Sequence, residues 1–218
     1  MTDSPRSNPT ATMPEPPYWA RACDELASRD EILRRLIAVH RDDVLRGSGD
    51  AFRTLVNAIV GQQISVAAAA GIWRRLTGAH PRLTPRALAE ADAADLRAAG
   101  LSTRKTEYIQ SIASAFVDGR INPSAWSSMK DDELRDELVA YRGIGPWTAD
   151  MVLIFHARRP DVLPLGDLGL VNAAARLYGW NGASRTERLR QHAERWRPWR
   201  TVATWFIWRD LDAEPVIY

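Results

Sequence analysis

A stretch near the middle of the chain, from Leu138 to Met151, limits the possible fold more than any other. It reads LVAYRGIGPWTADM, so apolar residues at helical spacing lead into two glycines and a proline follows them. Glycines on either side of one apolar residue allow backbone angles that other residues avoid. Proline favours the first turn of a helix. The sequence therefore predicts two helices joined by a tight hairpin, with Ile144 held between them.

The outer surface of such a hairpin would present bare backbone amides at the start of its second helix. Together with the positive end of the helix dipole, these amides form a site for an anion such as a phosphate. We expect the contacts to come from the amides near Gly143, Gly145 and Thr148, with Arg142 and Lys105 adding positive charge.

Helical patterns also dominate the rest of the chain. Apolar residues recur at helical spacing behind residues that favour helix N-caps. A Ser-Arg-Thr-Glu run from Ser184 to Glu187 has the pattern of a capping box. We predict an all-α fold of about ten helices over residues 18–218, after a Pro-, Ser- and Thr-rich disordered tail over residues 1–17. The expected single-residue caps are Asp50, Ser65, Thr84, Asp92 and Ser102.

Composition limits the class of protein and the kinds of site. The longest run of bulky apolar residues, Met151 to Phe155, is too short to cross a bilayer, so we expect a soluble cytoplasmic protein. A net charge of +2 permits a nucleic-acid partner without requiring one. The single cysteine, Cys23, excludes a disulfide framework and an iron-sulfur cluster, and the four histidines lack metal-ligand spacing. We therefore expect no catalytic metal and no redox cofactor.

Four segments in order carry a resemblance to a known family. They are Gly61–Val66 (GQQISV), the hairpin, Leu163–Leu168 (LPLGDL), and Trp196–Ala203 (WRPWRTVA) running on to Trp208. Across roughly residues 30–212 the chain resembles the helix-hairpin-helix DNA glycosylase superfamily, and most closely its alkylation-repair branch, the 3-methyladenine DNA glycosylase II (AlkA-like) proteins. The resemblance implies two helical lobes around a cleft. It also implies a monomer that acts on double-stranded DNA containing alkylated bases, here without the N-terminal β-rich domain of many relatives.

Asp167 is the candidate catalytic residue. From its neighbours alone it reads as a helix N-cap, because a helix-like run follows it. The resemblance implies that it is also the catalytic aspartate, and both roles are compatible. Cleaving an N-glycosidic bond builds positive charge on the sugar, so a carboxylate fixed near C1′ stabilises the transition state. A base alkylated on a ring nitrogen is already cationic and leaves without a second acid.

Trp147 occupies the position at which lyase-type relatives carry a Schiff-base lysine. The chain therefore resembles a monofunctional enzyme that leaves an abasic site in an intact strand. Asp150, one turn further on, is expected to be a structural or surface carboxylate.

The base pocket is expected to be less aromatic than in the best-known relatives. Most of the nine tryptophans should pack in the core. The resemblance places Trp147 and Trp208 in the pocket, together with Met151 and Leu168, where relatives carry tyrosines. An aromatic ring against a cationic base contributes about 2 kcal/mol when desolvated, which favours alkylated over neutral bases.

The GQQ turn is the candidate for opening the DNA helix. The resemblance places Gln63 in the wedge position, with Gln62 and Ser65 beside it at the DNA. The alternative is that both glutamines only satisfy backbone groups in an interhelical turn. Similar hairpins hold a monovalent cation, Na⁺ or K⁺, which would here lie on the carbonyls of Val139, Tyr141 and Ile144.

The predicted function is excision of alkylated bases in base excision repair. The bases would be chiefly 3-methyladenine, with 7-methylguanine, 1-methyladenine and 3-methylcytosine as further candidates. Two alternatives remain open at this point: a non-catalytic protein that binds distorted DNA through the same hairpin, and a glycosylase for another lesion.

Overall fold

The computed structural model describes residues 13–211, and this part of the chain contains helices and no strands. It has twelve α-helices and two short 3-10 helices, so the predicted all-α class is confirmed and the predicted number of about ten is slightly low. The elements are α1 Trp19–Arg29, α2 Glu31–Val39, α3 Ala51–Gly61, α4 Val66–Ala79, α5 Pro85–Ala89, α6 Ala93–Ala98, α7 Thr103–Val117, η1 Pro123–Ser128, α8 Asp131–Val139, α9 Pro146–Phe155, α10 Leu168–Leu177, α11 Arg185–His192, η2 Ala193–Trp196 and α12 Arg200–Arg209.

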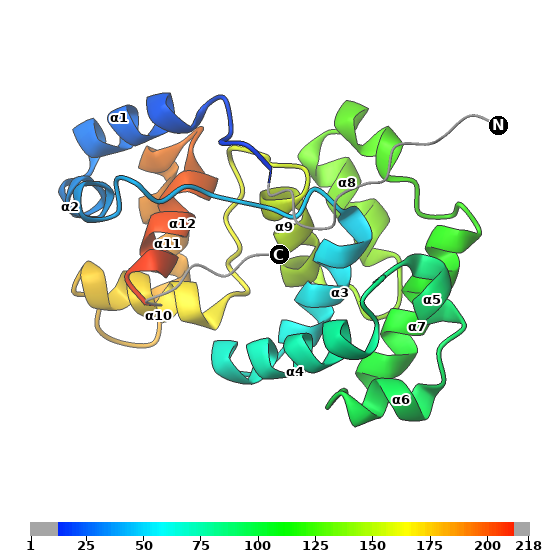
Figure 1. The fold of residues 1–218 in the computed structure, drawn as a ribbon. Helices are drawn as coiled ribbons and strands as arrows, with labels where there is room; N and C mark the ends of the chain where they lie inside the picture. Colours follow the sequence, from blue (N-terminus) through cyan, green and yellow to red (C-terminus); the bar gives the residue numbers. More distant parts are fainter. Residues whose placement is uncertain (1–12, 212–218) are drawn as a thin grey trace.

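The helices form two lobes (Figure 1). In one lobe α3 packs against α4, α7 and α9, α8 packs against α9, and α5 and α6 pack against α7. In the other lobe the first two helices join the last ones, because α12 packs against α1, α2 and α10, and α10 packs against α11. Residues 40–50 and residues 156–167 connect the two lobes (Figure 1).

Helix α9 lies in the core of its lobe. All its residues from Thr148 to Phe155 are buried, and its sequence is apolar around most of its circumference. A helix with this pattern is stable only when it is buried inside the protein. The second helix of the predicted hairpin is therefore held rigidly by α3 and α8, which positions everything at its N-terminus.

A buried ion pair joins α8 to α9. Arg135 Nε lies 3.0 Å from Asp150 Oδ1, and the same guanidinium reaches Asp132 Oδ1 at 2.7 Å. Burial raises the pKa of Asp150 to about 6, against the opposing effect of the Arg135 charge. Asp150 is therefore the structural carboxylate that the sequence indicated, and it lies in the core rather than on the surface.

A second buried carboxylate, Asp30, holds the other lobe together. It caps α2 and accepts hydrogen bonds from Tyr178 Oη, His192 Nε2 and Trp196 Nε1 at 2.9–3.0 Å. Burial alone would raise the pKa of Asp30, but the hydrogen bonds from His192, Trp196 and the helix amides outweigh it and hold the pKa well below its usual range. One carboxylate thus ties α2 to the chain segments that follow it by about 150 residues.

The predicted single-residue caps are confirmed, whereas the capping box is wrong. The side chains of Asp50, Ser65, Thr84, Asp92 and Ser102 each accept a backbone amide at a helix start. Ser184 precedes α11 but makes no such bond. Its backbone, at φ −95° and ψ 30°, lies outside the extended region that the confirmed caps adopt. The Glu187 carboxylate is bound instead by Arg190 at 2.6–2.7 Å and by Gln191 at 2.6 Å.

Most of the predicted N-terminal tail, residues 1–17, lies outside the described residues. The part that is described, residues 13–17, contacts the body of the protein: Met13 N donates to Gly47 O at 3.0 Å and Arg158 donates to Pro14 O at 2.5 Å. Within residues 13–211, none of the helices combines the length and the apolar character needed to cross a bilayer.

Candidate active site

One large cavity of about 1550 Å³ brings the predicted site residues together. Its wall combines parts of both lobes. One lobe contributes the turn between α3 and α4, helix α7, the hairpin and α9, and the other contributes the start of α10 and the end of α12. The predicted residues that line it are Gln62, Gln63, Ser65, Lys105, Gly143, Ile144, Gly145, Trp147, Thr148, Met151, Asp167, Leu168 and Trp208. Arg142 is the one predicted DNA contact that does not line it.

Asp167 is held by hydrogen bonds to both of its carboxylate oxygens. As the N-cap of α10 it accepts the amide of Leu170 on Oδ1 at 2.8 Å, and Trp147 Nε1 donates to Oδ2 at 2.9 Å. The N-cap interpretation is confirmed. Because the two donors come from different helices, the carboxylate is fixed in orientation while each oxygen keeps a lone pair free for a further partner. The positive end of the α10 helix dipole lies beside this carboxylate.

Gly169 allows this arrangement, although the sequence analysis did not single it out. A Cβ at this position would lie 3.0 Å from Asp167 Oδ1, a separation at which one of the two groups must shift. The sequence feature that could have identified Gly169 is its place two residues after the capping Asp167, where the helix backbone approaches the aspartate side chain.

The cavity has an apolar and aromatic wall from α9 and α12. Trp147, Met151 and Phe155 follow one another at intervals of four along α9, so they share one face. The Phe155 ring stacks on Trp208 with centroids 6.0 Å apart and an angle of 9° between the planes. Phe155 and Trp205 line the cavity and were missed, and the spacing of four on α9 would have found Phe155.

Leu168 differs from its predicted place inside the pocket. It borders the cavity, but as the first residue of α10 its side chain is 74% exposed, so it lies at the mouth. Met151, by contrast, is only 1% exposed and belongs to the inner wall.

The hairpin has the predicted form. Gly143 adopts φ +97°, and a Cβ there would lie 2.3 Å from the ring of Tyr108, so only glycine fits. Ile144 is buried between the helices, as expected. Within the described residues, the amides of Gly145, Trp147 and Thr148 have no hydrogen-bond acceptor. Three unpaired donors at the start of α9 form a suitable site for an anion.

Two basic side chains beside the hairpin have partners of their own. Arg142 is exposed, lies over the Tyr108 ring at 5.7 Å and approaches Glu107 at 3.4 Å. Lys105 Nζ donates to the carbonyls of Val60 and Gln62, both at 2.8 Å, and burial lowers its pKa. A phosphate contact by either residue stays a prediction.

The two glutamines of the turn behave differently. Gln62 Nε2 donates to Gly143 O and to Thr148 Oγ1, both at 2.9 Å, so this side chain does satisfy groups of the protein. Gln63 is exposed and adopts φ +56°, a conformation that residues other than glycine rarely take. Ser65 Oγ accepts the amide of Ala68 as the cap of α4, at 3.3 Å.

No group of three or more His, Cys, Asp or Glu side chains in residues 13–211 is arranged to hold a metal ion. The predicted monovalent cation would use backbone carbonyls instead. One of these, Tyr141 O, accepts the amide of Ile144 at 3.0 Å and keeps one lone pair, so a cation there stays a prediction.

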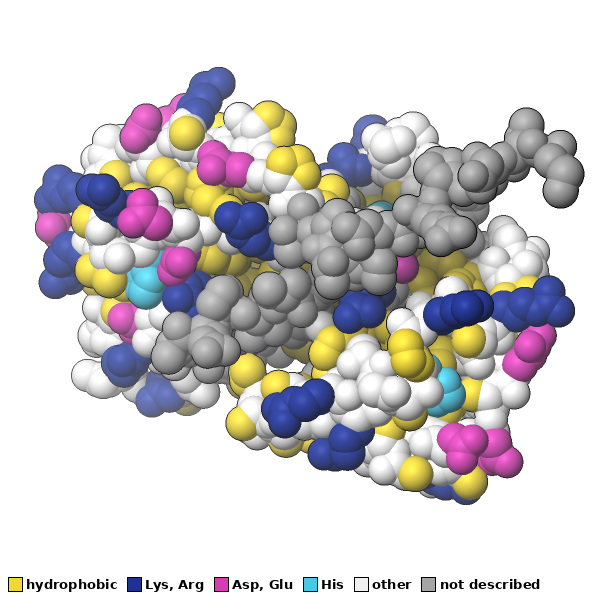
Figure 2. Space-filling view, viewed as in Figure 1, with side chains coloured by type: hydrophobic (Ala, Val, Ile, Leu, Met, Phe, Trp, Pro, Cys, Tyr) yellow, Lys and Arg dark blue, Asp and Glu magenta, His cyan; other side chains and the backbone are white. Residues whose placement is uncertain are grey.

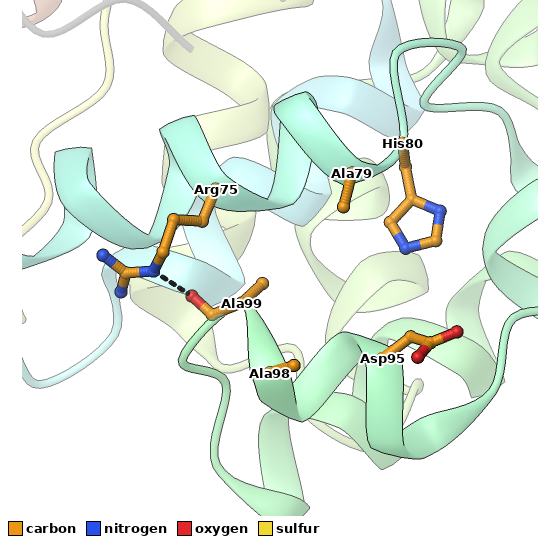
Figure 3. A pocket seen from close by; sticks show the side chains of 6 residues that line it. All are labelled: Arg75, Ala79, His80, Asp95, Ala98 and Ala99. Carbon is orange, nitrogen blue, oxygen red and sulfur yellow. Dashed lines mark hydrogen bonds between the residues drawn. The ribbon is translucent and has the colours of Figure 1, made fainter.

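On the face of the described residues that Figure 2 shows, the charged side chains do not gather into a second site. Figure 2 shows Lys and Arg side chains spread over both lobes, with Asp and Glu among them. A smaller cavity of about 290 Å³ lies between the end of α4 and α6, where Arg75 Nε donates to Ala99 O at 2.8 Å (Figure 3). None of the predicted site residues lines it.

Sequence comparisons point to one family. Residues 56–198 match the family described as HhH-GPD superfamily base excision DNA repair protein. The chain is 31% identical over 193 residues to DNA-3-methyladenine glycosylase 1 of Schizosaccharomyces pombe, covering 84% of each protein. It is 33% identical over 194 residues to DNA-3-methyladenine glycosylase 2 of Escherichia coli, covering 84% of this chain and 66% of that protein.

Solved structures agree with these matches. The S. pombe 3-methyladenine DNA glycosylase Mag1, in complex with abasic DNA, superposes with a TM-score of 0.78 at 29% identity, over 87% of this chain and 95% of that one. A DNA-3-methyladenine glycosidase from Bacillus halodurans gives 0.70 at 29% identity over 92% of each chain. An 8-oxoguanine glycosylase/lyase from Clostridium acetobutylicum gives 0.72 at 16% identity over 87% of this chain and 70% of that one, which shows the shared fold alone.

Proposed function

Because the chain belongs to the HhH-GPD superfamily of base excision DNA repair proteins, we propose that it is a DNA glycosylase that excises alkylated bases from double-stranded DNA. One observation carries the proposal: the Asp167 carboxylate, fixed by Trp147 and by the first turn of α10, lines the same cavity as the aromatic wall and the hairpin amides. The names of the relatives from S. pombe and E. coli support an alkylated purine as the substrate.

The proposed reaction is hydrolysis of the N-glycosidic bond. The bond between C1′ and the base nitrogen breaks, the base leaves with the bonding electrons, and positive charge develops on the sugar. The Asp167 carboxylate, at the N-terminus of α10, stabilises this charge and orients a water molecule for attack on C1′. The oxygen of the water becomes the new substituent at C1′, and its proton passes to the carboxylate or to solvent.

Selection of the base follows from its charge. A ring-alkylated purine is cationic, and indole faces attract cations more strongly than neutral rings. Trp147 and Trp208, the latter backed by Phe155, supply such faces. 3-Methyladenine is the proposed main substrate, with 7-methylguanine, 1-methyladenine and 3-methylcytosine as further candidates.

DNA binding is proposed to use two turns. The free amides at the start of α9 bind backbone phosphates, with Arg142 adding positive charge nearby. Exposed Gln63, at the tip of the turn before α4, fills the gap when the damaged nucleotide leaves the stack.

We propose that the product is an abasic site in an uncut strand. Trp147 replaces the lysine that lyase-type relatives use, and the nearby Lys105 ammonium is already bound to two backbone carbonyls. The proposal requires no redox cofactor and no catalytic metal.

The test is release of free base from a duplex carrying one 3-methyladenine. We expect the free base to appear, and the strand to break only after alkali treatment. Retarded DNA without free base would instead identify a non-catalytic DNA-binding protein. Excision of uracil or an oxidised purine from a lesion panel, with methylated bases left in place, would also contradict the proposal. A covalent adduct trapped by borohydride would overturn the monofunctional mechanism.

A further inference from the structure

We propose that Gln62 and Lys105 are positioning residues that brace the opening turn, residues 61–65, against the phosphate hairpin, residues 142–148. In this arrangement Gln63, which enters the DNA stack, stays at a fixed distance from the amides at the start of α9, which bind the DNA phosphates. The inference rests on the proposed function, because it concerns how the same site opens a base pair.

Lys105 fixes the start of the opening turn. Its ammonium donates to the carbonyls of Val60 and Gln62, which lie at the C-terminal end of α3. Those carbonyls have no helical partner and lie at the negative end of the helix dipole, so the half-buried ammonium of Lys105 stabilises both. In the described part of the chain no carboxylate pairs with Lys105, so the two carbonyls are its principal partners.

Gln62 joins the opening turn to the phosphate hairpin. Both of its amide hydrogens are used there, one on Gly143 O and one on Thr148 Oγ1, at 2.9 Å each. Thr148 is buried in the first turn of α9 and Gly143 lies at the bend. One side chain from the turn therefore bonds both to the bend of the hairpin and to its second helix.

Helix α7 supports both turns from behind. Lys105 and Tyr108 are three residues apart and lie on the same face of this helix. Lys105 reaches the opening turn, while the Tyr108 ring packs directly on Gly143 of the phosphate hairpin. The two turns and α7 thus form a closed set of contacts.

The backbone of the opening turn needs such support. Gln63 holds φ +56°, which costs free energy and persists only where the surroundings enforce it. Without the brace the turn relaxes. Gln63 then no longer lies opposite the space that the damaged nucleotide leaves in the DNA stack, whose position is set by the phosphates bound at the hairpin. The step that suffers is opening of the base pair, and bond cleavage afterwards is affected less.

The experiment compares one lesion in two settings. Single-turnover excision of 3-methyladenine is measured in a fully paired duplex and in a bulge where the lesion is already unpaired. For Gln62→Leu, which keeps the bulk and removes two hydrogen bonds, we expect the paired-to-unpaired rate ratio to fall about tenfold. Lys105→Met should lower the same ratio, and Lys105→Arg, which retains donors for both carbonyls, should restore most of it.

Gln110→Leu is the matched control. Gln110 also lies on α7 and also donates its amide to a backbone carbonyl, that of Ala91 at 2.9 Å, but it does not line the cavity. We expect its rate ratio to equal that of the wild type. Equal losses on both substrates for Gln62→Leu and Lys105→Met would overturn the brace and indicate direct contact with DNA or a general loss of folding.

A second readout keeps the brace testable if the proposed function fails. If the wild type releases no base from the paired or the unpaired substrate, the glycosylase proposal is refuted and the brace is not. The brace is then tested by 2-aminopurine fluorescence opposite an abasic-site analogue at saturating protein, which reports unstacking without chemistry. A smaller signal for Gln62→Leu than for Gln110→Leu supports the brace, and equal signals overturn it.

Discussion

Trp147 and Asp167 meet through a single hydrogen bond, from the indole nitrogen to Oδ2 at 2.9 Å. Trp147→Phe keeps an aromatic ring in the wall and removes only this donor. A hydrogen bond to a charged group is worth about 1.5–3 kcal/mol, so we expect the single-turnover rate to fall about 10- to 100-fold while DNA affinity changes little.

The control for this variant is Trp180→Phe, because Trp180 stacks on Tyr178 at 5.0 Å and lies away from the cavity. Its rate should match the wild type. A Trp147→Phe rate within twofold of the wild type would show that the indole N–H does not position the carboxylate.

At the scale of residues, the sequence predicted which residues belong to the site better than it predicted the contacts that they make. Asp167 was found both as a cap and, through the family resemblance, as the catalytic candidate, and its capping bond is present. Its bond to Trp147 joins residues 20 apart and depends on how the starts of α9 and α10 are placed relative to each other, which no local pattern reveals. Tyr108 was missed for the same reason, because its packing against Gly143 crosses from α7 to the hairpin.

At the scale of elements, the α8–α9 ion pair makes stability depend on pH. The pKa of Asp150, raised by burial to about 6, lies above its ordinary value. The folded protein therefore binds this proton more tightly than the unfolded chain, and the associated stability is lost as the pH rises through about 6. Arg135 offsets the cost of the buried charge at higher pH.

Arg135→Met should accordingly be most harmful in alkaline solution. We expect the free energy of unfolding to fall by about 3–5 kcal/mol at pH 8, where a buried carboxylate is left unpaired. At pH 5 the loss should be smaller because Asp150 is protonated. Urea denaturation at both pH values measures it, with Arg120→Met, an exposed partner of Asp118, as the control. An equal loss at both pH values would contradict the assignment.

Helix boundaries were predictable wherever a cap bonds to its own helix. Ser65 and Ser102 illustrate this, since each needs only an amide three residues ahead. The capping box at Ser184 failed because its backbone is not extended and because Arg190 and Gln191 bind its partner Glu187. A single cap is therefore easier to predict than a capping box, which also needs its second side chain to be free of other partners.

At the scale of the whole molecule, Asp30 links the beginning of the chain to its end. Asp30→Asn keeps the shape but removes a charge that accepts bonds from Tyr178, His192 and Trp196. We expect the free energy of unfolding at pH 7 to fall by about 3 kcal/mol, roughly the value of one or two bonds to a charged acceptor.

The pH dependence of this effect has the opposite sign to that of Asp150. Because the folded-state pKa of Asp30 is depressed, its stabilisation is present above the ordinary aspartate pKa and declines as the pH falls towards the folded value. The difference between wild type and Asp30→Asn in urea denaturation should therefore shrink between pH 7 and pH 3.5. A difference that grows in acid would contradict this role.

The two-lobed arrangement was predicted through the family resemblance and not from periodicity. Helical spacing shows which face of a helix is buried, but it does not show that α12 packs against α1 and α2, at the other end of the chain, as well as against α10. The brace between the two DNA-facing turns was equally hidden, since it joins residues about 80 positions apart.

The central claim is that the Asp167 carboxylate stabilises a cationic sugar, and the Asp167→Asn variant tests it most directly. Single-turnover release of 3-methyladenine should fall by about 100-fold or more, because the amide keeps the shape but removes the charge. Affinity for duplex DNA should stay close to that of the wild type. Release of the base by Asp167→Asn at the wild-type rate would contradict the account.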